Sequence, residues 1–292
     1  MNKILSRLFV FFVGIPLVIL IVCLPYFNHL ALHVLICAIT FIAATELYDI
    51  YKINHPLLSK KLIVGCSVFI PVIGMIYAVL PAVTGKSFPV GQEIITYALI
   101  VDFLLLLFSE VITAKTFETS NTRIASSVFI VLYSGYIITF ISRMTVIEIG
   151  GNNITTPLVS VFLLMVFMCD SLAWLFGVLL GKNNRGVVKA SPNKSVMGFI
   201  GGFAGSIAAG VLGYILWPNI FHGSILKIIF MGICIAFSSI VGDLTESIFK
   251  RSAGVKDSGH VIPGRGGVLD SIDSILMSAP VFYLMISILY GI

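Results

Sequence analysis

The chain has 292 residues, of which 58% are hydrophobic and only 11% are charged, and its formal net charge is +5. A soluble domain carries about a quarter charged residues, and this chain has a mean hydropathy of +1.08. These values exclude a water-soluble protein with buried helices, which needs more polar surface than this chain can supply, and indicate an integral membrane protein.

Apolar runs long enough to cross a bilayer, about 20 residues each, recur along the whole chain. We predict an all-α integral membrane protein with nine transmembrane helices, at about 8–26, 29–47, 62–83, 94–113, 124–142, 157–180, 196–217, 224–245 and 274–292. The first run resembles a signal peptide but lacks a small-residue cleavage site, so we expect it to be retained. In the fourth run, Asp102 and Glu110 require a partner that the sequence does not identify.

Positive charges predict the orientation, because cytoplasmic loops near membrane spans collect Lys and Arg. With a cytoplasmic N-terminus and an outside C-terminus, fifteen of the eighteen cations fall on the cytoplasmic side, and Lys86, Arg143 and Lys227 are the exceptions. The net charge is therefore a sign of topology and gives no reason to expect nucleic-acid binding.

The chemically suggestive residues are concentrated in the second half of the chain. We predict five N-terminal transmembrane helices in residues 1–156 and a catalytic region in residues 157–292. Two loops of that region, Gly181–Gly198 and Lys250–Gly267, combine cations with glycine and proline. Irregular backbone at membrane depth is tolerated where it is buried or lines a wet cavity, so these loops are expected to cap a polar chamber.

A cluster of carboxylates accompanies the second of these loops, and one further carboxylate lies in the sixth span. The residues are Asp170, Asp243, Glu246, Asp257, Asp270 and Asp273. Helical spacing places the members at 243 and 246 on one stripe, and those at 270 and 273 on another. Carboxylates at the edge of a bilayer usually face a cavity, and several together favour Mg²⁺, which also bridges to substrate phosphates. The simpler alternative is pairing of Asp243 and Asp270 with Lys250 and Arg251.

Cations and glycines nearby could bind phosphate. The cations are Lys194, Lys250, Arg251, Lys256 and Arg265, and the "PGRGG" segment offers backbone N–H groups that glycine leaves accessible. The simpler interpretation of such loops is that they only follow the positive-inside rule.

These residues carry a family resemblance. The segment "SIFKRSAGVKDSGHVIPGRGGVLDSID" resembles the signature of phosphatidate cytidylyltransferases, the CDP-diacylglycerol synthases: S-x-x-K-R, four residues, K-D, then P-G-H-G-G and L-D-R-x-D. The preceding Gly242, Asp243 and Glu246 also fit. Upstream, a second family motif is matched by Asp170, Ala173, Gly177, Gly181, Ser191, Pro192 and Lys194.

The resemblance implies roles for the matched residues. It implies Mg²⁺ binding by Asp243 and Asp270, with Glu246 and Asp273 adjacent, and leaves room for a monovalent cation. It implies phosphate contacts by Lys250, Arg251 and Lys256, with Asp257 organising the loop. The nucleotide or phosphatidate pocket would include Ser191, Lys194, Gly264, Arg265, Gly266 and Gly267.

The implied activity is attack of phosphatidate on CTP, forming CDP-diacylglycerol and pyrophosphate, with the lipid bilayer as medium and a homodimer as one possible assembly. We expect a bacterial cytoplasmic (inner) membrane enzyme whose site faces the cytoplasm, where CTP is found. A cation or lipid transporter that uses intramembrane carboxylates is an alternative. So is an inactive relative.

Three departures from the family pattern motivate that last alternative. Arg265 stands where the family has histidine, Ser271 where it has arginine, and Met197 where it usually has glutamate. Arg265 cannot act as a base or a metal ligand, but it can clamp a phosphate. We therefore hypothesise that Arg265 replaces the charge missing at Ser271.

Overall fold

The computed structural model describes residues 14–86, 89–262 and 266–292. Within these ranges, eight helical segments are long and apolar enough to cross a membrane. They are α3 (Leu30–Tyr51), α4 (Lys60–Thr84), α5 (Glu93–Thr113), the segment Ser120–Met144, α8 (Thr155–Leu179), α9 (Val196–Leu216), α10 (Ile225–Ser252) and α11 (Leu269–Tyr290). Residues 8–13 of the first predicted span lie outside the described residues, and its described part contains α2 (Ile15–Cys23). The prediction of an all-α integral membrane protein is confirmed.

Three helices extend beyond the apolar runs that predicted them. The helix α3 continues to Tyr51, α10 continues to Ser252, and α11 already begins at Leu269. Hydropathy marks where a chain is apolar, whereas a helix continues as long as its backbone hydrogen bonds do. Polar side chains at 243–251 and at 270–273 therefore lie on helices and have fixed spacing.

The chain packs as two compact units. Unit 1 comprises Met1–Val146 and Phe249–Ser271, and unit 2 comprises Ile147–Ile248 and Ile272–Ile292. The segment that carries the cytidylyltransferase-like signature thus begins in one unit and continues in the other. The division at residue 156 was a prediction about function, which packing does not test, and it stays a prediction.

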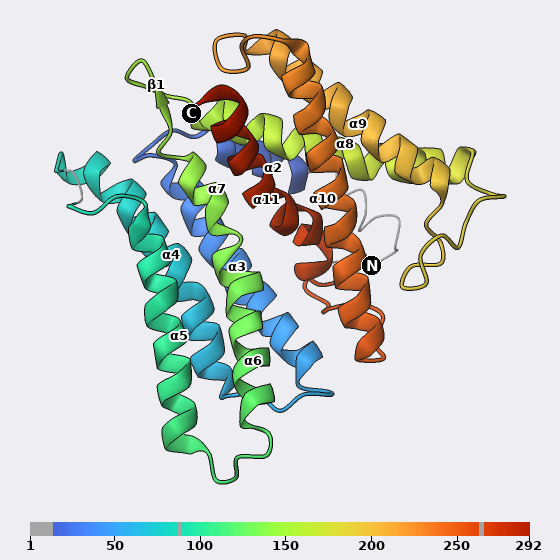
Figure 1. Cartoon of the computed structure of the whole chain (residues 1–292). Coiled ribbons are helices and arrows are strands. Elements are labelled where there is room, and N and C mark those ends of the chain that lie inside the picture. Colours follow the sequence, from blue (N-terminus) through green and yellow to red (C-terminus); the bar gives the residue numbers. More distant parts are fainter. Residues whose placement is uncertain (1–13, 87–88, 263–265) are drawn as a thin grey trace. The chain divides into compact units, whose positions relative to one another are not determined.

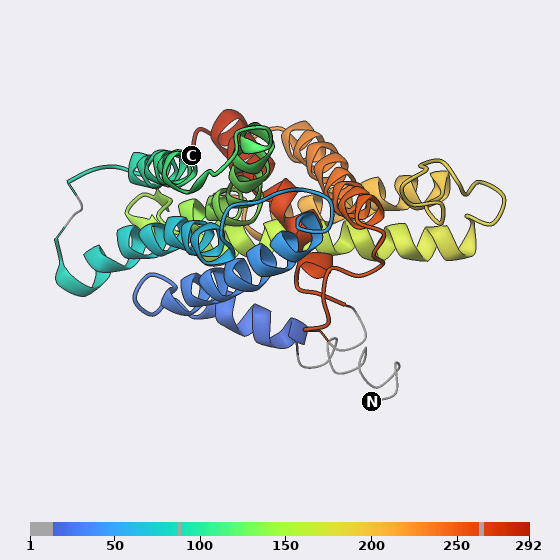
Figure 2. The same cartoon turned by 90° about the horizontal axis from the view of Figure 1, so that it is seen from below.

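In unit 1, α4 is flanked by α3 and α5 (Figure 1), and Figure 2 shows the same neighbours from below. The predicted span 124–142 is not one regular α-helix: α6 (Ser120–Ile130) and α7 (Thr139–Met144) are joined by a π-helical turn, η2 (Val131–Tyr136). Gly135 in this turn lies against α4, where a Cβ atom would come within 2.5 Å of the Ser67 carbonyl oxygen. The glycine therefore allows close approach of two backbones.

An aromatic cluster fastens the segment 249–271 to the N-terminal helices of unit 1. The Phe249 ring packs edge-on against Phe129 and Tyr133, with ring centroids 5.5 and 5.4 Å away. Tyr51 stacks on Phe129 at 5.5 Å. Such pairs contribute about 0.5–1.5 kcal/mol each beyond the area that they bury. The cluster holds the end of α10 against α3 and α6.

In unit 2, α8 and α9 pack along each other through glycines of α9. A Cβ atom at Gly201 would lie 2.5 Å from the Leu172 carbonyl oxygen, and one at Gly205 would collide with the Met168 carbonyl oxygen. Small residues permit such close helix packing in membranes. Before α8, a two-stranded hairpin pairs β1 (Glu148–Ile149) with β2 (Asn152–Asn153).

Candidate functional site

The loop between α8 and α9 positions Lys194 through local hydrogen bonds. Lys194 N–H donates to the Ser191 carbonyl over 3.1 Å, closing a turn that has Pro192 in its second position. Gly186 N–H donates to the Lys194 carbonyl over 3.1 Å. Ser195 then caps α9 by accepting from Gly198 N–H. The Ser-Pro turn identified in the sequence therefore orients Lys194.

Lys194 forms an ion pair with Asp243 of α10, between Nζ and Oδ2. The two side chains are 31% and 30% exposed, so the pair is accessible to a polar ligand. Burial alone would lower the pKa of Lys194, but the charges of Asp243, Asp170 and Asp273 outweigh it and raise the pKa. Lys194 is thus a cation among carboxylates and stays protonated at neutral pH.

Asp170 of α8 belongs to the same arrangement in unit 2. Its Oδ1 atom accepts from the hydroxyl groups of Ser239 and Ser274, over 3.3 and 3.4 Å. Two other carboxylates of this unit are less accessible, because Asp273 is 7% exposed and Glu246 is 1% exposed. Of the metal ligands predicted from the sequence in this unit, Asp243 is therefore the most accessible.

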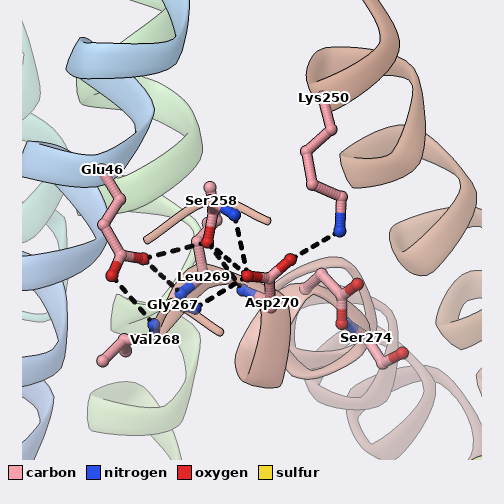
Figure 3. Close-up of polar contacts among 9 residues, drawn as sticks. Glu46, Lys250, Ser258, Gly267, Val268, Leu269, Asp270 and Ser274 are labelled. Atoms are coloured by element: carbon pink, nitrogen blue, oxygen red, sulfur yellow. Dashed lines mark hydrogen bonds and ion pairs between the residues drawn. The ribbon is translucent and has the colours of Figure 1, made fainter. Parts of the chain in front are cut away.

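Asp270 lies in unit 1 and is already fully engaged there (Figure 3). Its Oδ2 atom accepts from Ser258 N–H, Ser258 Oγ and Gly267 N–H, over 2.8, 2.9 and 2.8 Å. Its Oδ1 atom accepts from Lys250 Nζ over 2.5 Å. The simpler alternative is thus met in part, by the Asp270–Lys250 pair, whereas Asp243 forms its ion pair with Lys194.

Glu46 of α3 is a further member of this network, and the sequence analysis missed it (Figure 3). It is 6% exposed and accepts from Ser258 Oγ, Val268 N–H and Leu269 N–H, over 3.2, 3.0 and 2.8 Å. The first N–H groups of a helix have no partner within it, and an anion there is favoured by the helix dipole. Glu46 therefore caps the start of α11 from a helix more than 200 residues away in sequence.

Two glycines make room for the Glu46 carboxylate. A Cβ atom at Gly259 would collide with Glu46 Oε1, and one at Gly267 would collide with Glu46 Oε2 and Ser258 Oγ. Gly267, which belongs to the family-like signature, is thus explained in part by packing against a buried acid.

The remaining predicted site residues are more scattered. Arg251, Lys256 and Asp257 are exposed in unit 1, and Ser191 is half-buried in unit 2. Gly266 adopts a φ of +110°, whereas Gly264 and Arg265 lie outside the described residues. Asp243 and Asp270 belong to different units. Their shared metal site, like the other site assignments, stays a prediction.

The structure also identifies neighbours for the two intramembrane acids of α5. The Glu110 side chain is 5% exposed, and its Oε1 atom lies 3.4 Å from Arg123 Nη1 at the start of α6. Asp102 is 1% exposed and lies near Cys66 of α4. The Glu110–Arg123 pair therefore helps to hold α5 and α6 together within unit 1.

Comparisons with known proteins agree with the signature. A family model described as "Cytidylyltransferase family" matches residues 5–289. Phosphatidate cytidylyltransferase of Synechocystis sp. is 42% identical over 42% of this chain and 41% of its own length. Phosphatidate cytidylyltransferase 4, chloroplastic, of Arabidopsis thaliana is 34% identical over 58% and 48%. The Staphylococcus haemolyticus enzyme of the same name is 38% identical over 42% and 46%. The chain thus spans about half the length of the curated relatives it matches.

Proposed function

Because the chain belongs to the cytidylyltransferase family, we propose that it transfers a cytidylyl group from CTP to phosphatidate. A phosphatidate phosphate oxygen attacks the α-phosphorus of CTP, a new P–O bond forms, and the bond to the β-phosphate breaks. The products are CDP-diacylglycerol and pyrophosphate. The printed names of the relatives describe this reaction class for those proteins.

The observation that carries the proposal is the Lys194–Asp243 pair with Asp170 nearby. A partly exposed lysine among carboxylates can exchange its partner for a substrate phosphate, because a phosphate oxygen is an equally good acceptor for an ammonium group. Lys194 would then neutralise charge on the polyphosphate. The loop hydrogen bonds that orient Lys194 would keep it in place during that exchange.

Mg²⁺ is part of the proposal because the donor set suits it. Among the described residues, no group of three or more His, Cys, Asp or Glu side chains is arranged to hold an ion. Mg²⁺ commonly needs only one or two carboxylates, since waters and substrate phosphates complete its coordination. Asp243 and Asp170 would supply such a pair, with the Ser239 and Ser274 hydroxyls orienting Asp170. When bound, the ion would neutralise phosphate charge.

The proposed reaction requires no general base on the protein. A phosphatidate phosphate is already ionised at neutral pH, so catalysis depends on positioning and on charge neutralisation. This accounts for a site that is rich in aspartate and lysine. In unit 1, Lys250 and the loop held by Asp270 and Glu46 would position phosphate-binding groups, including the exposed Arg251 and Lys256. We further propose that the site faces the cytoplasm, the source of CTP.

A direct assay tests the proposal. The detergent-purified protein is supplied with radiolabelled CTP, phosphatidate and Mg²⁺, and labelled CDP-lipid is measured. Lys194→Gln and Asp243→Asn should each lower kcat by about 10²- to 10³-fold, the range seen when one charge-stabilising group is removed. Lys189→Gln is the matched control, because it removes an exposed cation from the same loop.

The result that would overturn the proposal is absence of CDP-lipid from a folded protein. Ion or lipid flux in liposomes would then support the transporter alternative. Full activity in both Lys194→Gln and Asp243→Asn would be compatible with the proposed reaction but would show that this ion pair takes no part in it.

A further inference from the structure

An apolar groove runs along α3 and α4 in unit 1, with a volume of about 840 Å³. One wall is formed by Phe41 of α3, and the other by Val64, Val68 and Val72 of α4. The α4 residues recur every fourth position, which places them on one face of the helix. The volume is within the range of ordinary ligand sites, about 300–1,000 Å³.

Gly65 gives this groove its depth. A Cβ atom at Gly65 would have no heavy atom within 4 Å, so the position faces open space. From Lys60 to Val72 the groove follows α4 for about 18 Å, at a helical rise of about 1.5 Å per residue. A groove of this length, parallel to a membrane-spanning helix, matches an extended acyl chain.

Two lysines at the first positions of α4 line one end of the groove. Lys60 Nζ is engaged by both carboxylate oxygens of Asp49, each at 2.7 Å, and lies over the Tyr48 ring. Lys61 is exposed, and its ammonium group has no ion pair within the part of the chain that the structure describes. Lysines near the end of a membrane helix extend toward the head-group region. The groove therefore has an apolar length and one uncompensated positive charge at its end.

We propose that this groove binds one phospholipid of the bilayer, with an acyl chain along Val64, Gly65 and Val68 and an anionic head group at Lys61. The single free charge favours a head group with net negative charge. A zwitterionic head group brings its own ammonium, which would compete with Lys61 for the phosphate. A lipid is favoured over a second copy of the chain as the occupant, because helix–helix interfaces in membranes are enriched in small residues. Gly65 here stands among valines.

This site does not depend on the proposed enzymatic activity, so its test uses lipid retention. Purified protein in detergent is incubated with phosphatidylglycerol or phosphatidylcholine, and bound lipid is counted by native mass spectrometry. The wild-type protein should retain phosphatidylglycerol in preference. Lys61→Gln should lower that retention about fivefold, equivalent to the attraction of one lysine to an anionic surface. It should leave phosphatidylcholine retention unchanged.

Filling the groove is the second arm of the test. The Cβ atom that Gly65→Leu adds lies in open space, so we expect the protein to fold and the added side chain to lower retention of the lipid. Val101→Leu, at an exposed position of α5 outside the groove, controls for added apolar volume. Lys115→Gln, an exposed lysine elsewhere in unit 1, controls for lost charge. Thermal melting in detergent verifies the fold of each variant.

Three results would overturn the proposal. Equal retention of the two lipids by the wild-type protein would remove the head-group assignment. Unchanged phosphatidylglycerol retention in folded Gly65→Leu would show that the acyl chain does not bind in this groove. Loss of a dimer in Gly65→Leu, with lipid retention unchanged, would assign the groove to a second copy.

Discussion

Replacement of Glu46 by glutamine should loosen the start of α11 although the side chain keeps its size. The Glu46 carboxylate accepts hydrogen bonds from three donors. Its Oε1 atom accepts from Val268 N–H, and its Oε2 atom accepts from Leu269 N–H and from the Ser258 hydroxyl. A glutamine amide has one acceptor oxygen and one NH₂ group. In either orientation, its NH₂ group faces a backbone N–H, and that N–H loses its partner.

The expected magnitude follows from the cost of a buried donor without an acceptor. That cost is about 1–3 kcal/mol, which corresponds to about 5- to 150-fold faster hydrogen exchange if the segment opens locally. Hydrogen–deuterium exchange with mass spectrometry should therefore show faster exchange in peptides covering 258 and 266–270. Peptides from α4 should exchange as in the wild-type protein.

Two further variants make the Glu46 test specific. Glu118→Gln is the matched control, because it removes an exposed carboxylate from the same unit. Glu46→Ala should open the segment more than Glu46→Gln, since both backbone N–H groups then lose their acceptor. Unchanged exchange around 266–270 in Glu46→Gln would refute the capping role.

Three further predictions concern packing, ion pairs and pH. Gly267→Ala should lower the melting temperature, because its methyl group would collide with neighbouring oxygens. Gly65→Ala should not lower it, because the methyl group enters open space on a helix, where alanine is preferred to glycine. Equal melting of the two variants would contradict the packing. Arg123→Gln should cost about 1–3 kcal/mol because it leaves a buried carboxylate without its cation, and Lys60→Gln should cost under about 1 kcal/mol because its pair is exposed; a reversed order would contradict the burial argument. Against the lowering effect of burial, the nearby carboxylates raise the pKa of Lys194 above its ordinary value of 10.5, so on the alkaline side its ion pair persists until the pH rises through that raised pKa. The loss of activity in Lys194→Gln should therefore be the same from pH 6.5 to 9, and a loss that varied across this range would argue against it.

The transmembrane helices could be predicted because hydropathy reports directly on what a bilayer requires. Their ends could not, since Glu246 and Asp270 interrupt the apolar pattern without interrupting the helix. The π-helical turn at Val131–Tyr136 was also missed. It depends on Gly135 meeting the α4 backbone, and no local pattern in the sequence reports such a contact.

The residues of the candidate site were predicted better than their partners. Lys194 and Asp243 were both selected from the sequence, but for separate roles, because nothing in their spacing reveals that they pair. Glu46 was not selected at all. The principle that picked out Asp102 and Glu110, an acid within an apolar run, applies equally to Glu46, which lies inside the predicted span 29–47. Applying it to every span would have found the residue, although not its contacts.

Gly267 has two different interpretations, one from the sequence and one from the structure, and an experiment can distinguish them. The sequence predicts that this glycine lets backbone approach a phosphate. In the structure its N–H donates to Asp270 Oδ2, and its missing side chain leaves room for Glu46 and Ser258. An amide that is already hydrogen-bonded can bind substrate only after Asp270 releases it. If Gly267 serves mainly to admit Glu46, then Gly267→Ala should reproduce the faster exchange of Glu46→Ala and leave the KM for CTP unchanged. A raised KM with normal exchange would instead place the glycine at the phosphate.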